Sequence, residues 1–360
     1  MQSKRRVGII GATGMVGQRF VSLLAAHPWF EPGVLAASAR SAGRSYAEAV
    51  AGRWSLPGPV PEAVAGLPVQ DASRVAAIAG QVDLVCCAVD LPREQVRQLE
   101  EEYARHECPV VSNNSACRQL PDVPMVVPEL NPGHLEVIPQ QRRRLGTRRG
   151  FIAVKPNCSL QSYLPALHPL RVFGPRQVIV CTYQAVSGAG KTLASWPAMA
   201  DNVVPHIGGE EEKSEREPLK IWGSLTEQGI VPAEQPVFSA QCIRVPVSDG
   251  HLAAMAVAFD RSPAREEILA AWESFGRSTL PQQLGLPSAP QPFLQYFQEV
   301  DRPQTRLDRE LGQGMAIAIG RLRPDPVLGW KLVCLSHNTL RGAAGGAVLI
   351  AELLAAQGWI

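Results

Sequence analysis

The sequence lacks three patterns that would assign it to a class at once. No stretch of about 18 apolar residues runs uninterrupted, as a membrane-spanning helix would require. The formal net charge is only +2, which favours neither nucleic acid nor another polyanion as a partner. The eight cysteines show no CxxC or Cys/His ligand spacing. We therefore predict free thiols in the cytoplasm, without a disulfide framework or a metal site.

Two short stretches are rich in basic residues. The start, MQSKRRVGIIGATG, has too short an apolar stretch to predict a signal peptide. The one basic cluster, QQRRRLGTRRG (residues 140–150), lies between apolar segments, and we expect a solvated loop there. Binding of RNA or a membrane by these arginines is a minor alternative. We predict no nucleic-acid and no membrane partner.

The length of 360 residues and the 46% hydrophobic content predict a globular chain of two domains. In the first part, apolar strands alternate with helical patterns: RVGII, GVLAAS, VDLVCCAVD and CPVVSNN are strands, and VSLLAAH and PREQVRQLEEEYARH are helical. Such alternation predicts a parallel sheet with right-handed crossovers. We therefore predict an α/β fold with a Rossmann-type nucleotide-binding domain over residues 1–156.

The second part of the chain has a different pattern of apolar and polar segments. QVIVCTYQAV, QCIRVPV and HLAAMAVAF are β-rich runs separated by longer polar stretches, while GGEEEKSEREPLKIWGSL has a helical pattern. This predicts an α+β domain around a mostly antiparallel sheet. Near the end, WKLVCLSHN is expected to be a strand and AAGGAVLIAELLAAQ a helix.

A glycine turn follows the first predicted strand. Its GxxGxxG spacing, between a strand and a helix, lets backbone N–H groups approach a pyrophosphate. The predicted cofactor loop comprises Gly11, Thr13, Gly14, Met15, Val16 and Gly17.

The end of the second predicted strand bears on which dinucleotide binds. An NAD enzyme usually places Asp or Glu there for the ribose hydroxyls. This strand ends with ASARSAGRSY, which has no acid but offers Ser38, Arg40 and Ser41. A cation and two hydroxyls suit a 2′-phosphate, so we predict NADP, with NAD as the weaker alternative.

The stretch KPNCSLQSYLPAL places Cys158 directly before a helical pattern. Asn157 is expected to be the N-cap, and a helix N-terminus lowers the pKa of a thiol. Pro165 must bend or shorten that helix. Free cysteines are often simply buried, and we accept that interpretation for Cys86, Cys87, Cys181 and Cys334, which lie inside apolar strands. For Cys158 its predicted position favours a nucleophile.

A thiolate beside a nicotinamide cofactor indicates hydride transfer to or from a carbonyl held on sulfur, and this chemistry needs an acid/base. His251, after the turn SDG and at the start of a strand, is the best-placed histidine. Arg244 lies on the preceding strand. If these strands formed a hairpin, a two-residue loop would place Arg244 and His251 on one face and a three-residue loop would not. The sequence leaves this open.

Nine motifs, in order and over nearly the whole length, carry a resemblance: GATGMVG, ASARSAG, SNNSACR, VPELNP, PNCS, TYQAVSGAG, VVPHIGGEEEK, RVPVSDGH and HNTLRGAAGGAVL. The chain resembles the aspartate-semialdehyde dehydrogenases of the archaeal and fungal-type branch. That family reduces L-aspartyl 4-phosphate to aspartate 4-semialdehyde with NADPH and releases phosphate, on the route to lysine, threonine and methionine.

The resemblance implies a role for each matched catalytic residue. Cys158 would be the nucleophile and His251 the acid/base. Asn157 and Gln184 would position the acyl group and the intermediate. Ser187, Gly188 and Asn338 would lie against the nicotinamide.

The resemblance also implies how the substrate is held. Arg244 would bind the α-carboxylate and Glu210 the α-ammonium, while Lys213 and Arg118 would bind the departing phosphate. Glu211 and Glu212 are expected to lie on a solvated helix face. From sequence alone, Arg118 could equally be a surface arginine.

The family's architecture implies a division of the chain. The helix at 338–360 would return to complete the domain 1–156, and residues 157–337 would form the catalytic and dimerisation domain. The expected assembly is a homodimer or homotetramer.

Two departures and three alternatives accompany this resemblance. Leu160 stands where the family often has threonine, and SAR replaces a proline-containing version of the cofactor loop. A malonyl-CoA reductase would keep Cys158 and His251 but needs no counterpart of Glu210. An N-acetylglutamyl-phosphate reductase fits the motifs less well. A non-catalytic dinucleotide-binding regulator would not need Cys158, His251 and Arg244 together.

Overall fold

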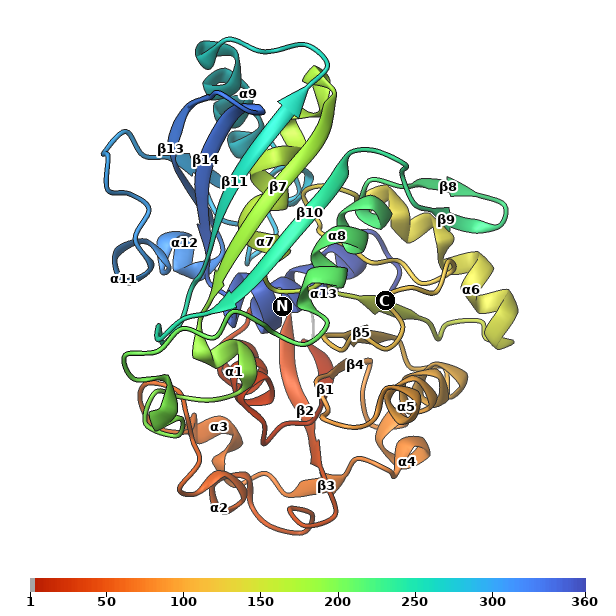
Figure 1. Cartoon of the computed structure of the whole chain (residues 1–360). Coiled ribbons are helices and arrows are strands. Elements are labelled where there is room, and N and C mark those ends of the chain that lie inside the picture. Colours follow the sequence, from red (N-terminus) through yellow and green to blue (C-terminus); the bar gives the residue numbers. More distant parts are fainter. Residues whose placement is uncertain (1–3) are drawn as a thin grey trace.

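The computed structural model describes residues 4–360, and its first sheet is built from short apolar strands (Figure 1). The six strands are β1 (Arg5–Ile10), β2 (Phe30–Ala37), β3 (Val69–Asp71), β4 (Leu84–Cys87), β5 (Val110–Ser112) and β6 (Ile152–Val154). Their order is β3-β2-β1-β4-β5-β6, and every neighbouring pair is parallel. The chain reverses its direction of winding between β1 and β4, where open α/β sheets bind their ligands.

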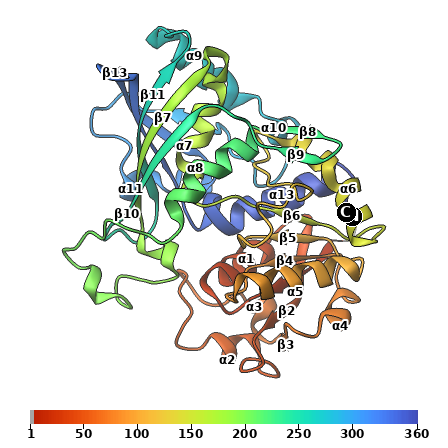
Figure 2. The same cartoon turned by 45° about the vertical axis from the view of Figure 1, so that its right-hand side comes forward.

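Helices cover both faces of this sheet, as its continuous apolar strands require (Figure 2). They are α1 (Met15–Ala25), α2 (Tyr46–Val50), α3 (Glu62–Ala65), α4 (Val75–Ala79), α5 (Arg93–Arg105), the 3-10 turn η1 (Pro132–Val137) and α6 (Ile138–Leu145). The predicted solvated loop at residues 140–150 is wrong in its first half. Arg142, Arg143 and Arg144 lie in the last turn of α6, where positive charge suits the helix dipole.

The second sheet is mixed. Its strands are β7 (Pro175–Gln184), β10 (Val237–Arg244), β11 (His251–Phe259), β12 (Leu294–Tyr296), β13 (Ile317–Asp325) and β14 (Gly329–Ser336), in the order β10-β7-β11-β14-β13-β12. The β7/β11, β11/β14 and β13/β14 pairs are antiparallel, and the two edge pairs, β7/β10 and β12/β13, are parallel. The predicted α/β fold with a second, mostly antiparallel α+β part is confirmed.

The hairpin considered for Arg244 and His251 does not exist. β7 lies between β10 and β11, because β10 pairs with β7 in parallel and β11 pairs with β7 antiparallel. The segment 245–250 crosses the end of β7 instead, and the Val186 N–H donates to its Val247 carbonyl at 2.9 Å. Arg244 and His251 therefore flank Gln184 at one end of the sheet.

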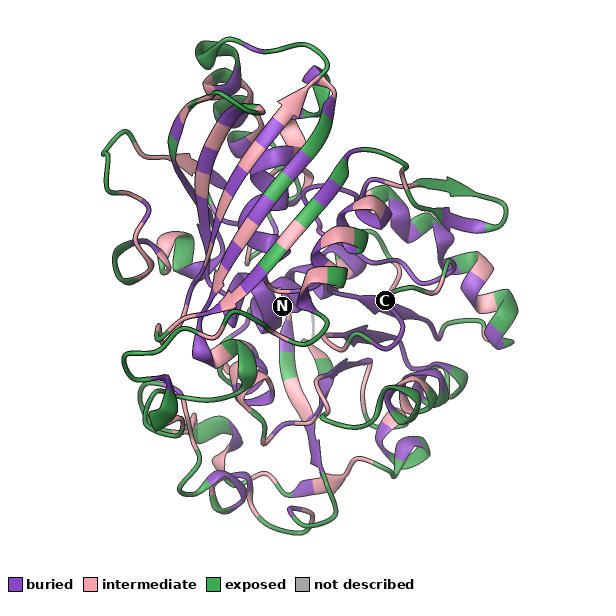
Figure 3. Cartoon of the chain, in the orientation of Figure 1, coloured by how far each residue is buried: buried purple, intermediate pink, exposed green. Residues whose placement is uncertain are grey.

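One face of the second sheet is covered by helices α7 (Leu160–Leu167) and α9 (Arg265–Arg277), and the other face is open (Figure 3). On the open face Ile179 is 52% exposed and Val237 59% exposed. Cys181 shares this face, so it is half-buried and not part of the core as predicted. None of the eight cysteines, all within the described residues, is in a disulfide.

The remaining elements connect the layers. They are η2 (His168–Phe173), η3 (Val186–Ala189), η4 (Pro197–Met199), α8 (Glu210–Ile221), the β8 (Ser224–Thr226)/β9 (Gly229–Val231) hairpin, α10 (Leu280–Gln283), α11 (Thr305–Asp308), α12 (Leu311–Gly314), η5 (Leu340–Ala344) and α13 (Gly345–Ala356). Among residues 4–360, no helix is both long and apolar enough to cross a membrane.

The last helix packs on the first sheet. Val348, Leu349 and Leu353 of α13 share one buried apolar cluster with Ile9 of β1 and Phe20 of α1. Figure 2 shows α13 lying over this sheet, between it and the second sheet. The chain therefore crosses twice between the two sheets, once before α7 and once after β14. The division at residues 156/157 and 337/338 stays a prediction.

Candidate active site

A cavity of about 220 Å³ opens where the carboxyl edge of the first sheet meets the end of the second. Two of its lining residues come after strands of the first sheet: Asn113 directly follows β5, and Cys158 comes soon after β6. Its lining brings together nine of the residues predicted from the sequence: Val16, Arg118, Asn157, Cys158, Ser187, Gly188, Glu210, Lys213 and Asn338. His251 approaches the same place from β11.

The central pair is Cys158 and His251. The Cys158 Sγ lies 3.4 Å from the His251 Nε2, and the His251 ring is fully buried. On the opposite side of the ring, the Ala185 backbone N–H donates to Nδ1 at 3.1 Å. In a neutral imidazole one nitrogen accepts and the other carries the proton. Nδ1 is the acceptor here, so the proton sits on Nε2 and faces the sulfur.

Burial decides the charge states of this pair. It lowers the pKa of His251 to about 3, with help from the positive charge of Arg244. Burial also raises the pKa of Cys158, as does Glu210, while Lys155, Arg118 and Arg244 oppose this shift. The lowered thiol pKa expected from the helix N-terminus is therefore not found. The resting pair is a neutral imidazole and a thiol.

The loop before α7 holds Cys158 through Asn157. The Asn157 Oδ1 accepts the Ser159 N–H at 2.8 Å, which makes a tight side-chain turn. The helix begins at Leu160, and the residue before it is Ser159, so the predicted N-cap at Asn157 is wrong by two residues. Leu160 is buried in the apolar core, and α7, with Pro165 inside it, is only eight residues long.

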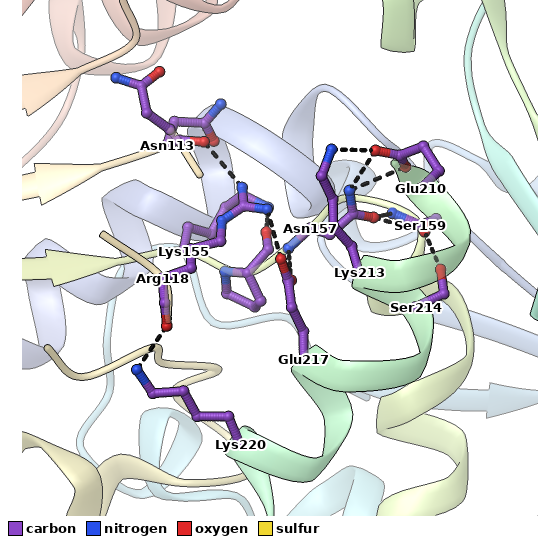
Figure 4. Close-up of polar contacts among 12 residues, drawn as sticks. Asn113, Arg118, Lys155, Asn157, Ser159, Glu210, Lys213, Ser214, Glu217 and Lys220 are labelled. Atoms are coloured by element: carbon purple, nitrogen blue, oxygen red, sulfur yellow. Dashed lines mark hydrogen bonds and ion pairs between the residues drawn. The ribbon is translucent and has the colours of Figure 1, made fainter. Parts of the chain in front are cut away.

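Helix α8 presents one charged face to this loop (Figure 4). Glu210, Lys213, Glu217 and Lys220 follow each other by three or four residues and therefore share a face. The Glu210 carboxylate accepts hydrogen bonds from Lys213 at 2.8 Å and from Asn157 at 3.0 Å. Burial alone would raise the pKa of Glu210, but the Lys213 charge and these hydrogen bonds outweigh it and lower the pKa.

The other side of α8 fixes the helix to the sheet. Glu211 accepts the Cys242 N–H at 3.2 Å, and Glu215 accepts the Ala240 N–H at 3.1 Å. These bonds satisfy the free edge of β10. Glu211 is therefore not the solvated residue that was expected, whereas Glu212 is exposed.

Arg118 is 6% exposed and is not a surface arginine. Its Nη1 pairs with the Glu217 carboxylate at 2.9 Å, and its Nη2 donates to the Asn113 carbonyl at 3.1 Å. Glu217 also accepts the Asn157 N–H at 2.6 Å, so one buried carboxylate ties Arg118 to the residue before the nucleophile (Figure 4). The Arg118 Nε is buried without a partner in the described residues, which leaves it free for an anionic ligand.

The second sheet supplies the opposite wall. The Arg244 Nη1 donates to the Ala185 carbonyl at 2.6 Å, and Gln184, 1% exposed, donates to Glu210 at 3.3 Å. A Cβ on Gly188 would lie 2.9 Å from the Arg244 Nη1 and 3.0 Å from the His251 Nε2. A side chain at this position would press on both groups, so glycine lets them lie close to the loop.

Asn338, at the second chain crossing, holds two loops of the second sheet. Its Nδ2 donates to the Ser187 Oγ at 2.8 Å, and its Oδ1 accepts the Gly250 N–H at 2.8 Å. The residue after β14 therefore holds both the Ser187 loop and the turn that precedes His251. Ser187 and Asn338 thus meet at the pocket.

The glycine turn fits a dinucleotide. A Cβ on Gly11 would lie 2.3 Å from the Ala88 carbonyl oxygen, and one on Gly17 would lie 2.1 Å from the Gly11 oxygen, so turn, strand and helix pack directly. Gly14 is exposed, and α1 begins without a capping side chain or an acid in its first turn. Free N–H groups at such an end bind phosphate. Met15 lines a second cavity of about 290 Å³, which shares Ser187 and Thr339 with the first.

The turn after β2 is where a 2′-phosphate was expected. Ser38 and Arg40 are exposed. Ser41 is 4% exposed, and its Oγ accepts a hydrogen bond from Arg53 at 3.2 Å. Within the described residues, the side chains of Ser38 and Arg40 make no hydrogen bond. Thr13, the other polar residue of the predicted cofactor loop, lies in the glycine turn, where its carbonyl accepts a hydrogen bond from the Gln18 side chain at 3.1 Å.

Sequence reasoning missed Asn113 and Lys155, which line the cavity, and Glu217, which pairs with Arg118 and accepts the Asn157 N–H. Asn113 and Lys155 each follow a buried parallel strand directly, and that position is itself a signal, because ligands collect at carboxyl edges. Glu217 is seven residues after Glu210, so helical periodicity could have placed it on the same face.

The chain is similar to proteins of a known family. Residues 6–138 match the family described as "Semialdehyde dehydrogenase, NAD binding domain", and residues 165–341 match "Semialdehyde dehydrogenase, dimerisation domain". The aspartate-semialdehyde dehydrogenase of Archaeoglobus fulgidus is 44% identical over 97% of each chain. This chain belongs to the aspartate-semialdehyde dehydrogenase family. The family enzyme of Cryptococcus neoformans is 41% identical over 99% of this chain and 98% of its own.

A solved structure agrees with this assignment. The aspartate-semialdehyde dehydrogenase of Candida albicans with NADP has a TM-score of 0.88 and 36% identity, and the match covers 99% of this chain and all of that one. The predicted resemblance to the archaeal and fungal-type branch is confirmed by these relatives.

Proposed function

We propose that this member of the family catalyses the NADPH-dependent reductive dephosphorylation of L-aspartyl 4-phosphate to L-aspartate 4-semialdehyde through a thioester on Cys158. One observation carries the proposal: the Cys158 Sγ lies 3.4 Å from the His251 Nε2 in a cavity lined by cations. The curated relatives bear the name of this activity, and the neighbouring structure binds NADP.

The cations give the substrate its orientation. Arg118 and Lys213 line the cavity together with Cys158, and the free Nε of Arg118 suits a phosphate oxygen. Arg244 lies against Gly188, which lines the cavity, and would receive the α-carboxylate as a planar fork on a planar anion. Glu210, already ionised by its contact with Lys213, would receive the α-ammonium.

The nucleophile and the histidine then divide the chemistry. The Cys158 thiolate attacks the acyl carbon, the C–O bond to phosphate breaks, and the phosphate leaves toward Arg118 and Lys213. The His251 Nε2–H points at the sulfur and donates to the oxygen on which negative charge develops. Gln184 and Asn157 fix the Glu210 carboxylate, and with it the substrate, beside the sulfur.

Bound NADPH would supply the hydride that reduces the thioester carbonyl. The glycine turn at residues 11–17 would hold its pyrophosphate, and Ser187, Gly188 and Asn338 would hold the nicotinamide end near Cys158. Ser38, Arg40 and Ser41 would receive the 2′-phosphate, which supports NADP over NAD.

An absorbance assay on pure protein tests this function. One cuvette holds aspartate semialdehyde, phosphate and NADP, and the other holds malonyl-CoA and NADPH. We expect turnover only in the first. Turnover only in the second would keep the fold and the role of Cys158 but contradict the substrate roles of Glu210 and Arg244.

We also propose that two copies associate through the open face of the second sheet. Ile179 and Val237 expose apolar side chains there, within the residues that match a dimerisation domain. Sedimentation equilibrium should give at least twice the chain mass, and a monomer mass would contradict the proposal. The eight unpaired thiols are compatible with a reducing cytoplasm, where we place the enzyme.

A further inference from the structure

One buried carboxylate on α8, that of Glu217, contacts both a cation of the cavity and the loop that carries the nucleophile. Its Oε1 lies 2.9 Å from the Arg118 Nη1, and its Oε2 accepts the Asn157 N–H at 2.6 Å. Arg118 and Asn157 both line the cavity together with Cys158. Glu217 itself is 1% exposed, so it reaches a bound ligand only through these two neighbours.

Other groups of α8 hold the remaining parts of the same two neighbours (Figure 4). Lys220 donates three hydrogen bonds to backbone carbonyls, and one of these, at 2.6 Å, goes to the Arg118 carbonyl. The Glu210 carboxylate accepts from the Asn157 Nδ2 at 3.0 Å. The main chain of Arg118 and the side chain of Asn157 therefore have anchors of their own. In the described part of the chain, Glu217 is the one side chain that holds the Arg118 guanidinium.

The hydrogen bonds of Arg118 leave one donor for a ligand. Its Nη1 pairs with Glu217, its Nη2 donates to the Asn113 carbonyl, and its buried Nε has no partner in residues 4–360. A guanidinium is planar and rigid, so two contacts at its Nη atoms also fix the direction of the Nε–H bond. Glu217 therefore determines where the free donor points.

We propose that Glu217 is a positioning residue that orients Arg118 for phosphate and thereby sets the affinity for phosphate more than the reactivity of Cys158. The inference deepens the proposed function and rests on it, because phosphate is a substrate only of a phosphorylating enzyme. Asn157 keeps its contacts with Glu210 and with the Ser159 N–H when Glu217 is changed, so the nucleophile loop depends less on this carboxylate.

The reaction that starts from aspartate semialdehyde separates the two effects in time. In the first step the sulfur of Cys158 bonds to the aldehyde carbon, a hydride passes to NADP, and one proton is released, which leaves the thioester. In the second step an oxygen of hydrogen phosphate attacks the acyl carbon, and the C–S bond breaks with its electron pair on sulfur. The sulfur takes up the phosphate proton. The first step therefore reports on Cys158, and the second reports on Arg118.

Glu217→Gln is the first test. A carboxylate accepts with two oxygens, but an amide accepts with one. The Asn157 N–H lies on a fixed backbone and the Arg118 side chain can turn, so we expect the amide oxygen to stay with Asn157. The KM for inorganic phosphate should rise at least about 10-fold. The NADPH burst without phosphate should slow by no more than about 3-fold. A slowed burst with an unchanged KM for phosphate would overturn the proposal.

Two further variants control for the fold and for the charge. Glu212→Gln makes the same chemical change at an exposed position of the same helix and should alter neither value. Glu217→Asp keeps the buried negative charge opposite Arg118, so it remains a test if Glu217→Gln does not fold. Its carboxylate is shorter by one carbon and is drawn away from the guanidinium, so the KM for phosphate should still rise. An unchanged KM in Glu217→Asp would contradict a positioning role.

A double-mutant cycle shows whether Glu217 acts through Arg118. Arg118→Met should raise the KM for phosphate by about 100-fold, because it removes a charge-assisted donor. Adding Glu217→Gln to that variant should raise the KM further by no more than about 2-fold. A further rise as large as that of Glu217→Gln alone would mean that the two residues act independently, which would overturn the proposal.

A binding measurement distinguishes failure of this proposal from failure of the proposed function. Calorimetric titration with inorganic phosphate needs no turnover. If the wild-type protein binds phosphate and Glu217→Gln binds it at least about 10-fold more weakly, without any oxidation of aspartate semialdehyde by the wild type, the positioning role stands and the function falls. If the wild type turns over and Glu217→Gln has an unchanged KM for phosphate, the function stands and the positioning role falls. Thermal melting curves establish that each variant is folded.

Discussion

Two parts of the proposed site, the cavity around Cys158 (the inner end) and the turn after β2 (the outer end), are built in opposite ways. At the inner end, Arg118, Asn157, Glu217 and His251 are between 0% and 7% exposed, and each has hydrogen-bond partners within the protein. At the outer end, Ser38 and Arg40 lie exposed in the turn after β2. The inner end is preorganised before any ligand arrives, as catalysis requires. The side chains of Ser38 and Arg40 make no hydrogen bond within the described residues, so changes to them should affect selectivity rather than chemistry or stability.

Replacing His251 should have the largest effect at the inner end. His251→Ala removes the N–H that faces the Cys158 sulfur, and we expect kcat to fall by about 10²–10⁴-fold. His106→Ala, in an exposed position at the end of α5, is the control and should leave kcat unchanged. A loss of only a few-fold for His251→Ala would make this histidine structural, and the inner end would then lack its proposed donor.

Breaking the buried ion pair should cost stability as well as activity. Glu217→Gln leaves the Arg118 charge buried and uncompensated, and we expect the free energy of unfolding in urea to fall by about 3 kcal/mol. Glu273→Gln disrupts the exposed pair with Arg277, whose side chains are 65% and 72% exposed, and should cost no more than about 0.5 kcal/mol. Equal losses of unfolding free energy for the two variants would mean that the buried ion pair contributes no more to stability than the exposed one.

The smallest effect is expected at the outer end. Arg40→Ala should weaken NADPH binding about 10-fold, roughly 1.4 kcal/mol, and change NADH binding little. Isothermal titration with each cofactor measures both values, and the melting temperature without cofactor should not move. An equal loss for the two cofactors would mean that Arg40 does not bind the 2′-phosphate.

Local sequence patterns were enough to predict part of the fold. The strand–glycine turn–helix at residues 5–25 depends on residues that are neighbours along the chain, so periodicity and spacing reveal it. Cys158 and His251, 93 residues apart, were joined only by chemistry and by resemblance, and their sulfur–nitrogen contact appears only in three dimensions.

What could not be predicted depends on pairing between distant segments. The placement of β7 between β10 and β11 is a choice of sheet order that none of the three strands encodes alone. The same holds for Lys155, whose side chain packs against Gly346 of α13: a Cβ there would lie 3.3 Å from the lysine Cδ. Ala185 fixes the proton of His251 through a backbone N–H, which no sequence pattern marks.

The most direct test of the central claim, a thioester on Cys158, is a rapid-mixing experiment without phosphate. Enzyme is mixed with aspartate semialdehyde and NADP, and nicotinamide absorbance is followed. The account predicts a burst close to one NADPH per subunit and then near-arrest, because the acyl group has no phosphate acceptor. Adding phosphate should restore turnover, and Cys158→Ser should show neither phase while still binding NADP. Absence of a burst in the wild-type enzyme, or appreciable turnover by Cys158→Ser, would contradict the covalent mechanism.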